Sequence, residues 1–185
     1  MNTDLLKLLT NPDRARARKD CAKHTKDALR RSGSGLDLSD LNLTGVNLTG
    51  FDLRQANFTR TILHDAILDR ADVSGALFRC AGMEKISAKK ANFSGSYLHA
   101  GAIQASNFDG ANFSNLIDAT GALFHGCTFR SATVSGTLNG SLFFQCVFNG
   151  ADLTGASVEG ASFVESSLVK AIMASIKGRA VTFRS

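Results

Sequence analysis

The stretch LDLSDLNLTGVNLTGFDLRQANF, residues 36–58, repeats its pattern of apolar and polar side chains every five residues. An amphipathic helix repeats about every 3.6 residues and a half-buried strand every two, so neither explains this period. We call the apolar third place of each pentad the centre, and the residue two before it the inner partner. These two point to the same side of a short extended segment. The period therefore predicts a three-residue strand with two inward side chains, followed by a corner.

The pattern continues almost to the end of the chain. Centres recur every five residues from Leu38 to Phe113, then at Phe124, Phe129 and Val134, and every five from Leu138 to Met173, with Phe183 last. Four such sides close a square coil of about 20 residues, and coils stack at roughly 4.8 Å. The pattern of residues 36–185 therefore predicts roughly seven and a half coils, and each coil is stabilised by stacking on its neighbours.

The corners and one shift of register refine this prediction. Glycine at the fifth place suits corners that need a positive φ; these glycines are Gly45, Gly50, Gly75, Gly95, Gly110, Gly150, Gly155 and Gly160. The centre Phe124 follows Phe113 after eleven residues, and Leu138 follows Val134 after four, so an insertion near residues 115–121 and a deletion near Ser135 cancel. We expect a bulged corner there.

Phenylalanine supports the distinction between inside and outside. Of the 13 phenylalanines, eleven are centres and Phe51 is an inner partner, which leaves only Phe144 facing outward.

The units ADLTG, ANFSG, ANFSN and LNLTG resemble the A(D/N)LXX unit of the pentapeptide-repeat proteins. The resemblance covers residues 36–185 and implies an all-β solenoid, a right-handed quadrilateral β-helix. We therefore divide the chain into an N-terminal basic helical cap segment, residues 1–35, and a pentapeptide-repeat β-helix, residues 36–185. The family has many roles, so the resemblance implies little about function.

Residues 1–35 carry nine Lys or Arg and four Asp, so they hold the whole net charge of +5. Asn11, Pro12 and Asp13 predict a helix start, and Gly33 predicts its end. The segment either caps the first coil or forms a basic arm for nucleic acid or an anionic membrane. We favour the α-helical cap, because aspartates interrupt the basic run and no aromatic is present for base stacking. The basic residues are Arg14, Arg16, Arg18, Lys19, Lys23, Lys26, Arg30 and Arg31.

We find no set of residues with catalytic or metal-binding spacing, and we expect no cofactor, no metal site and no enzymatic activity. His64 and His125 share one predicted side but lie three coils apart, roughly 14 Å. Cys127 and Cys146 are inner partners on adjacent coils, and we interpret them as small buried hydrophobes. The four cysteines are too sparse for a disulfide framework.

No transmembrane or signal segment is present, so we expect a leaderless cytoplasmic protein, with export by a specialised secretion system left open.

Two outward stripes are candidate binding surfaces. The apolar patch consists of Leu123, Leu142, Phe144 and Val164. The basic stripe consists of Arg70, Lys89, Lys90, Arg130 and Lys170, with Asp69 and Asp109 against it. The last pentad, VTFRS, is still in frame at Ser185, so the sequence also predicts an open last coil that a two-fold homodimer would cover.

These features favour a non-enzymatic protein–protein interaction module, a scaffold or adaptor with an unknown partner, including a bacterial effector that works inside a host cell. An alternative implied by the resemblance is a modulator of DNA gyrase, like the quinolone-resistance members of the family. Residues 36–185 carry twelve acids and twelve bases, so they lack the acidic surface of a DNA mimic. A third alternative is nucleic-acid binding through the basic N-terminal segment, which we rank last of the three.

Overall fold

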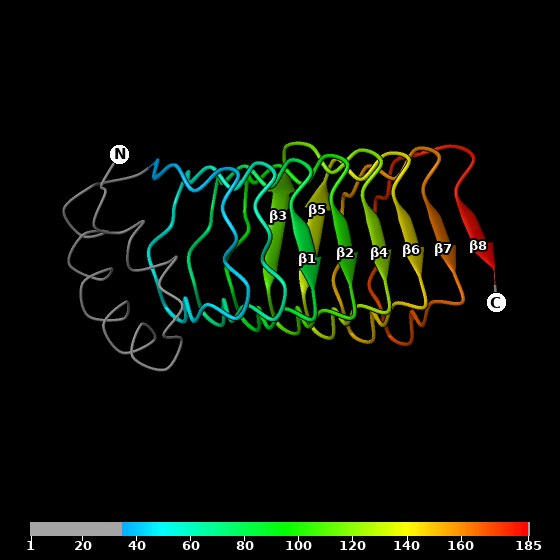
Figure 1. Ribbon diagram of the computed structural model, residues 1–185. Helices are drawn as coiled ribbons and strands as arrows, with labels where there is room; N and C mark the ends of the chain where they lie inside the picture. Colours follow the sequence, from blue (N-terminus) through cyan, green and yellow to red (C-terminus); the bar gives the residue numbers. More distant parts are fainter. Residues whose placement is uncertain (1–34, 185) are drawn as a thin grey trace.

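The computed structural model describes residues 35–184, and these form a parallel β-solenoid (Figure 1). Every coil runs around the same long axis, so the two ends of the described chain lie at opposite ends of a rod. The described residues contain strands, isolated bridges and turns, and no helix. The predicted N-terminal cap and its basic residues lie outside the described residues.

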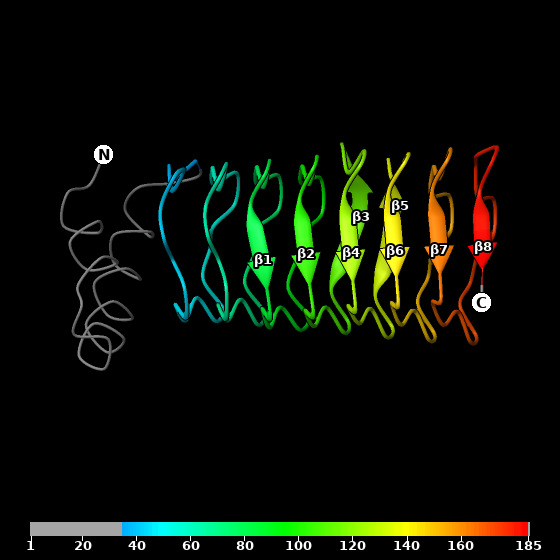
Figure 2. The same cartoon turned by 45° about the vertical axis from the view of Figure 1, so that its right-hand side comes forward.

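The strands form two parallel sheets on different sides of the rod (Figure 2). The first sheet has the order β1-β2-β4-β6-β7-β8, and the second pairs β3 with β5. The six strands of the first sheet are β1 (Gly82–Glu84), β2 (Ala102–Gln104), β4 (Leu123–His125), β6 (Leu142–Phe144), β7 (Ser162–Val164) and β8 (Thr182–Arg184). The other two are β3 (Asn112–Leu116) and β5 (Thr133–Gly136). We call the outer surface of the first sheet the six-stranded face.

Four ladders of bridges define the four sides of the coil. The first coil pairs Asp37 with Asn57, Asn42 with Ile62, Asn47 with Ile67 and Asp52 with Asp72, so each bridge joins residues one coil apart. The six-stranded face continues the second of these ladders through Ile62 and Gly82. The square coil of about 20 residues predicted from the five-residue period is therefore confirmed.

The corners are β-turns closed by backbone hydrogen bonds. At one of them, the N–H of Val46 donates to the Leu43 carbonyl at 3.2 Å, and Gly45 between them has a φ of 68°. All eight glycines predicted at corners have positive φ. Residues with side chains, such as Lys90 and Ala100, also take positive φ at the fifth place, because the ladders on both sides fix the turn.

The core consists of the centres and inner partners, packed in columns along the axis. Phe58 stacks on Phe78 with ring centroids 4.7 Å apart, and Phe129 stacks on Phe148 at the same distance. Such distances match the spacing between coils, so identical residues on adjacent coils stack without adjustment. Phe183, predicted as an inward centre, stacks on Phe163 but is 54% exposed, because no described coil lies beyond it.

The predicted bulged corner is present. Pairing between β3 and β5 shifts register after Phe113, so that Leu116 lies opposite Gly136. Ile117, directly after Leu116, lies at the surface, where it is 51% exposed. Gly136, in the shorter coil beside it, fits closely against the backbone of Leu116, and no side chain would fit there. The insertion and the deletion therefore complement each other at one corner.

Candidate functional site

The structure brings the four residues of the predicted apolar patch together on the six-stranded face. Leu123 on β4 pairs with Leu142 on β6, and Phe144 on β6 pairs with Val164 on β7. The patch therefore consists of two short columns on three adjacent strands. Leu142 is 37% exposed, and the other three are half-buried against their neighbours. Outward apolar side chains gathered in this way are typical of a contact surface.

A polar ladder borders the patch on one side. The His125 ring lies 5.1 Å from the Phe144 ring, and its Nε2 is 3.4 Å from Oε1 of Gln145. Gln145 Nε2 then donates to Oε2 of Glu165 at 2.8 Å. These bonds hold long polar side chains along the edge of the patch, so they leave the apolar columns uncovered.

A flat row of small residues borders the patch on the other side. Gly121, Gly140 and Gly160 occupy successive corners there, each with positive φ and with open space where a Cβ would lie. A second macromolecule can therefore approach the backbone at this edge. The ladder, the patch and the glycine row therefore lie side by side along this part of the six-stranded face.

The predicted basic stripe is less continuous. Arg70 and Lys90 occupy equivalent corners of adjacent coils, with the backbone N–H of Arg70 donating to the Lys89 carbonyl. Arg130 lies two coils further on and is paired with Asp109 at 3.3 Å. Lys170 lies two coils beyond Arg130. Asp69 likewise accepts a hydrogen bond from the backbone N–H of Lys89 at 2.9 Å, so acidic neighbours offset part of the stripe.

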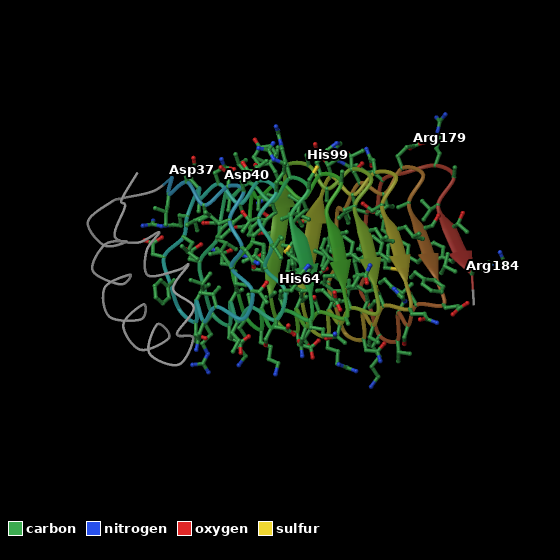
Figure 3. The ribbon with its side chains drawn as sticks, viewed as in Figure 1. Asp37, Asp40, His64, His99, Arg179 and Arg184 are labelled. Carbon is green, nitrogen blue, oxygen red and sulfur yellow. The ribbon has the colours of Figure 1, made fainter. Side chains whose placement is uncertain are left out.

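The histidines of the described chain do not converge. Figure 3 shows His64 and His99 on different sides of the rod. His64 accepts a hydrogen bond from the N–H of Glu84, while His99 pairs with Asp118 at 3.4 Å. Burial opposes ionisation of Asp118, but hydrogen bonds from Thr120 outweigh it and lower the pKa of this carboxyl. Between residues 35 and 184, no three His, Cys, Asp or Glu side chains lie close enough to hold a metal ion.

The cysteines lie where the pattern places them. Cys127 and Cys146 are buried on adjacent coils, and their thiols donate to the carbonyls of Ile103 and Phe124. The hydrogen bond with Cys146, together with burial, raises the pKa of the Cys127 thiol. Cys127 therefore stays protonated in the folded core. Cys80 is exposed at a corner.

Sequence reasoning missed two features of the surface. Arg79 lies 5.5 Å above the Tyr97 ring, beside the pair of His99 and Asp118. Glu84 on β1 and Arg184 on β8 face outward in the same column as Phe144. Both features could have been predicted from the sequence, because residues about 20 positions apart occupy the same place on successive coils and therefore lie in one column.

The repeat itself identifies the family. The family model for pentapeptide repeats matches eight copies of its unit, in residues 37–75 and 138–175. Both segments lie within the continuous solenoid described above. The chain is a pentapeptide-repeat protein.

Solved structures of several pentapeptide-repeat proteins are similar to this one. A trypsin-treated QnrB1 variant, a plasmid-mediated fluoroquinolone resistance protein, matches with 21% identity and a TM-score of 0.43, over 80% of this chain and 92% of that chain. HetL, involved in heterocyst differentiation regulation in the cyanobacterium Nostoc sp. strain PCC 7120, matches with 20% identity and a TM-score of 0.28, over 86% of this chain and 93% of that chain. No curated protein sequence matches the chain.

The part of this pentapeptide-repeat protein that the structure describes contains no helix long and apolar enough to cross a bilayer.

Proposed function

We propose that this pentapeptide-repeat protein is a non-enzymatic interaction module, a scaffold or adaptor that binds another protein through a side of its rod. The observation that carries the proposal is the outward apolar patch of Leu123, Leu142, Phe144 and Val164 on a rigid parallel sheet. Backbone ladders hold these residues in place before binding, so little conformational entropy is lost when a partner covers them.

The test compares binding by the intact protein with binding by a Leu142→Ser, Phe144→Ser double variant. Partners captured by the wild type are purified, and their Kd values are measured against both proteins. We expect the double variant to weaken binding at least about tenfold, because truncated apolar anchors in an interface each cost about 1 kcal/mol or more. A Val147→Ser variant on the neighbouring side of the same coils is the control. Equal affinities for all three proteins would rule out the patch.

The last described coil is a second candidate contact, which a homodimer would cover. Val169 is 59% exposed, Ile172 is 54% exposed and Phe183 is 54% exposed. They belong to the last described coil, whose outer edge pairs with no described strand, and edges of this kind pair readily with another chain. A Val169→Ser, Ile172→Ser variant is expected to dissociate such a dimer in light scattering, and an unchanged mass would refute this contact.

Modulation of gyrase is not part of the proposal. The twelve acids and twelve bases of residues 36–185 balance, so these repeats provide no acidic surface resembling DNA.

A further inference from the structure

The six-stranded face has an internal symmetry of residue types. Its strands follow the order β1-β2-β4-β6-β7-β8, so its midpoint lies between β4 and β6. Each strand presents two outward residues, one before and one after its buried centre. A half-turn about an axis that passes through this midpoint and runs along the strands places β4 on β6, β2 on β7 and β1 on β8. The outward residues of these strand pairs match in size, polarity or charge at several positions, among them Leu123 with Leu142 and Glu84 with Arg184, whereas Gln104 lies opposite Val164.

We propose that the six-stranded face binds a second copy of this chain, face to face, with the two rods antiparallel and a two-fold axis between β4 and β6. The inference rests on the proposed interaction role and names the occupant of the patch. A half-turn about an axis parallel to the strands reverses the order of the strands along the rod. It leaves the position of each residue along its strand unchanged. Residues that precede a strand centre therefore meet residues that precede one in the second copy.

Apolar groups meet at the centre of this arrangement. Leu123 on β4 lies against Leu142 on β6 of the second copy, and the reverse contact forms by symmetry. His125 lies against Phe144 of the second copy, which extends the contact already present between these two rings within one chain, at 5.1 Å. All four apolar and aromatic positions nearest to the axis are thus covered by groups of their own kind.

Small residues meet small residues on both sides of the axis. Gly121 lies opposite Gly140 of the second copy, and neither site has an atom within 4 Å of a built Cβ. On β2, Ala102 lies opposite Ser162 of β7. Because nothing projects at these positions, the two sheets approach closely enough for the leucine and phenylalanine contacts to form.

Charge complementarity fixes the antiparallel direction. Glu84 on β1 lies opposite Arg184 on β8 of the second copy. Among the described residues of one chain, Glu84 is paired only with the adjacent Lys85, at 3.0 Å, and both side chains are exposed, so Glu84 can accept a second cation. Figure 3 shows Asp37 and Asp40 at one end of the rod and Arg179 and Arg184 at the other. Parallel rods would bring the basic ends together, whereas antiparallel rods separate them.

The dimer is expected to be weak. Six strands at roughly 4.8 Å spacing, each about 10 Å long, cover a smaller area than the about 800 Å² per partner of a standard interface. We therefore expect a monomer–dimer equilibrium with a Kd in the micromolar range or above.

The test measures mass by light scattering and sedimentation over a wide concentration range, for the full chain. The charge variants are Glu84→Arg, Arg184→Glu and the two combined. Each single change places like charges opposite each other, and we expect it to raise the dimer Kd at least about fivefold. The combination exchanges the charges and should restore the Kd to within about twofold. Asp152→Arg and Lys170→Glu change the net charge equally on other sides and should leave the Kd unchanged.

Several outcomes would overturn the inference. A wild type that stays monomeric at every concentration refutes it, as do charge variants without effect or a combination that fails to restore dimerisation. A dimer that only Val169→Ser, Ile172→Ser dissociates assigns self-association to the end of the rod instead. If the wild type is monomeric but a purified partner needs Leu142 and Phe144, the interaction role stands and only the second-copy assignment fails. If neither a dimer nor a patch-dependent partner is found, both fail.

Discussion

At the residue scale, corners and inner partners are constrained in different ways. A corner must accept positive φ, which costs an ordinary residue about 1–2 kcal/mol relative to glycine. Most inner partners are small, and a polar one gains stability by donating to a carbonyl on the preceding coil. Thr61 and Ser141 do so, donating to Leu38 and Ala119 at 2.7 Å. Single substitutions at these two kinds of place therefore have distinct and predictable effects.

Gly136→Ala should lower the free energy of unfolding by about 3 kcal/mol or more. A Cβ there would meet the Leu116 backbone and lie 2.9 Å from the carbonyl carbon of Asn115, and neither can move without breaking the bulge. Gly140→Ala is the control, since it also has positive φ but open space, and should cost only about 1 kcal/mol. Urea unfolding followed by circular dichroism measures both. Equal losses would contradict the close packing at the bulge.

Ser96→Ala should leave stability unchanged or raise it by up to about 1 kcal/mol. The Ser96 hydroxyl is fully buried and has no hydrogen-bond partner among the described residues. Ser141→Ala, at an equivalent inner place, should instead lower stability by about 1 kcal/mol, because its hydroxyl donates to Ala119. The difference in urea midpoint between the two variants is the measurement, and a larger loss for Ser96→Ala would contradict the assignment.

At the element scale, the unit is one side of one coil, and its stability comes from the coils above and below. A defect therefore spreads along a column rather than along the chain. The column of Cys127 and Cys146 is one example, and the phenylalanine columns are another. Substitutions that point inward and outward from one strand should consequently behave differently.

Phe108→Asp should unfold the central coils, with a loss of more than about 4 kcal/mol, because the carboxylate would replace a ring that is 1% exposed and stacks on Phe129. Phe144→Ser faces outward and should change stability by less than about 1 kcal/mol. Thermal unfolding monitored by circular dichroism compares them. Similar losses in the two variants would show that the inside and outside positions are misassigned.

Native Cys80 should react with Ellman's reagent, whereas Cys127 and Cys146 should react only after denaturation, measured in a Cys21→Ser background. The raised pKa of Cys127 keeps its proton in the folded state, so this thiol contributes stability below about pH 8.5, the ordinary thiol pKa. That contribution is lost as pH rises further, because the unfolded thiol ionises first. A Cys127→Ala variant should lose less stability than the wild type between about pH 8 and pH 10.

The period of five was sufficient to predict the coil, its corners and even the compensated shift of register at Leu116 and Gly136. Local pattern determines these features, because each coil must fit the previous one. The surface was harder to predict. The apolar patch emerged because Leu142 and Phe144 break the polar pattern, but Glu84 and Arg184 are ordinary surface charges in sequence. Only the register across five coils aligns them in one column with the patch.

At the scale of the whole molecule, the outward columns give the rod four different long surfaces. The six-stranded face is apolar at its centre, and the side carrying Asp72, Asn92 and Asn112 is a polar ladder of linked side chains. Such sides act independently, since a residue on one does not contact the opposite one. The molecule can therefore bind a second copy on one side while its other sides stay accessible.

The equivalence of successive coils has a mechanical consequence. Removing one coil, about 20 residues, shortens the rod by roughly 4.8 Å and leaves every remaining column on its original side. Removing fewer residues than one coil rotates the part of the rod after the deletion about the long axis, relative to the part before it. A neighbouring coil can compensate for such a change, as the coil with Gly136 does for the coil with Leu116. Variants that lack whole coils would therefore bring two molecules bound along the rod closer in fixed steps, without altering their relative orientation.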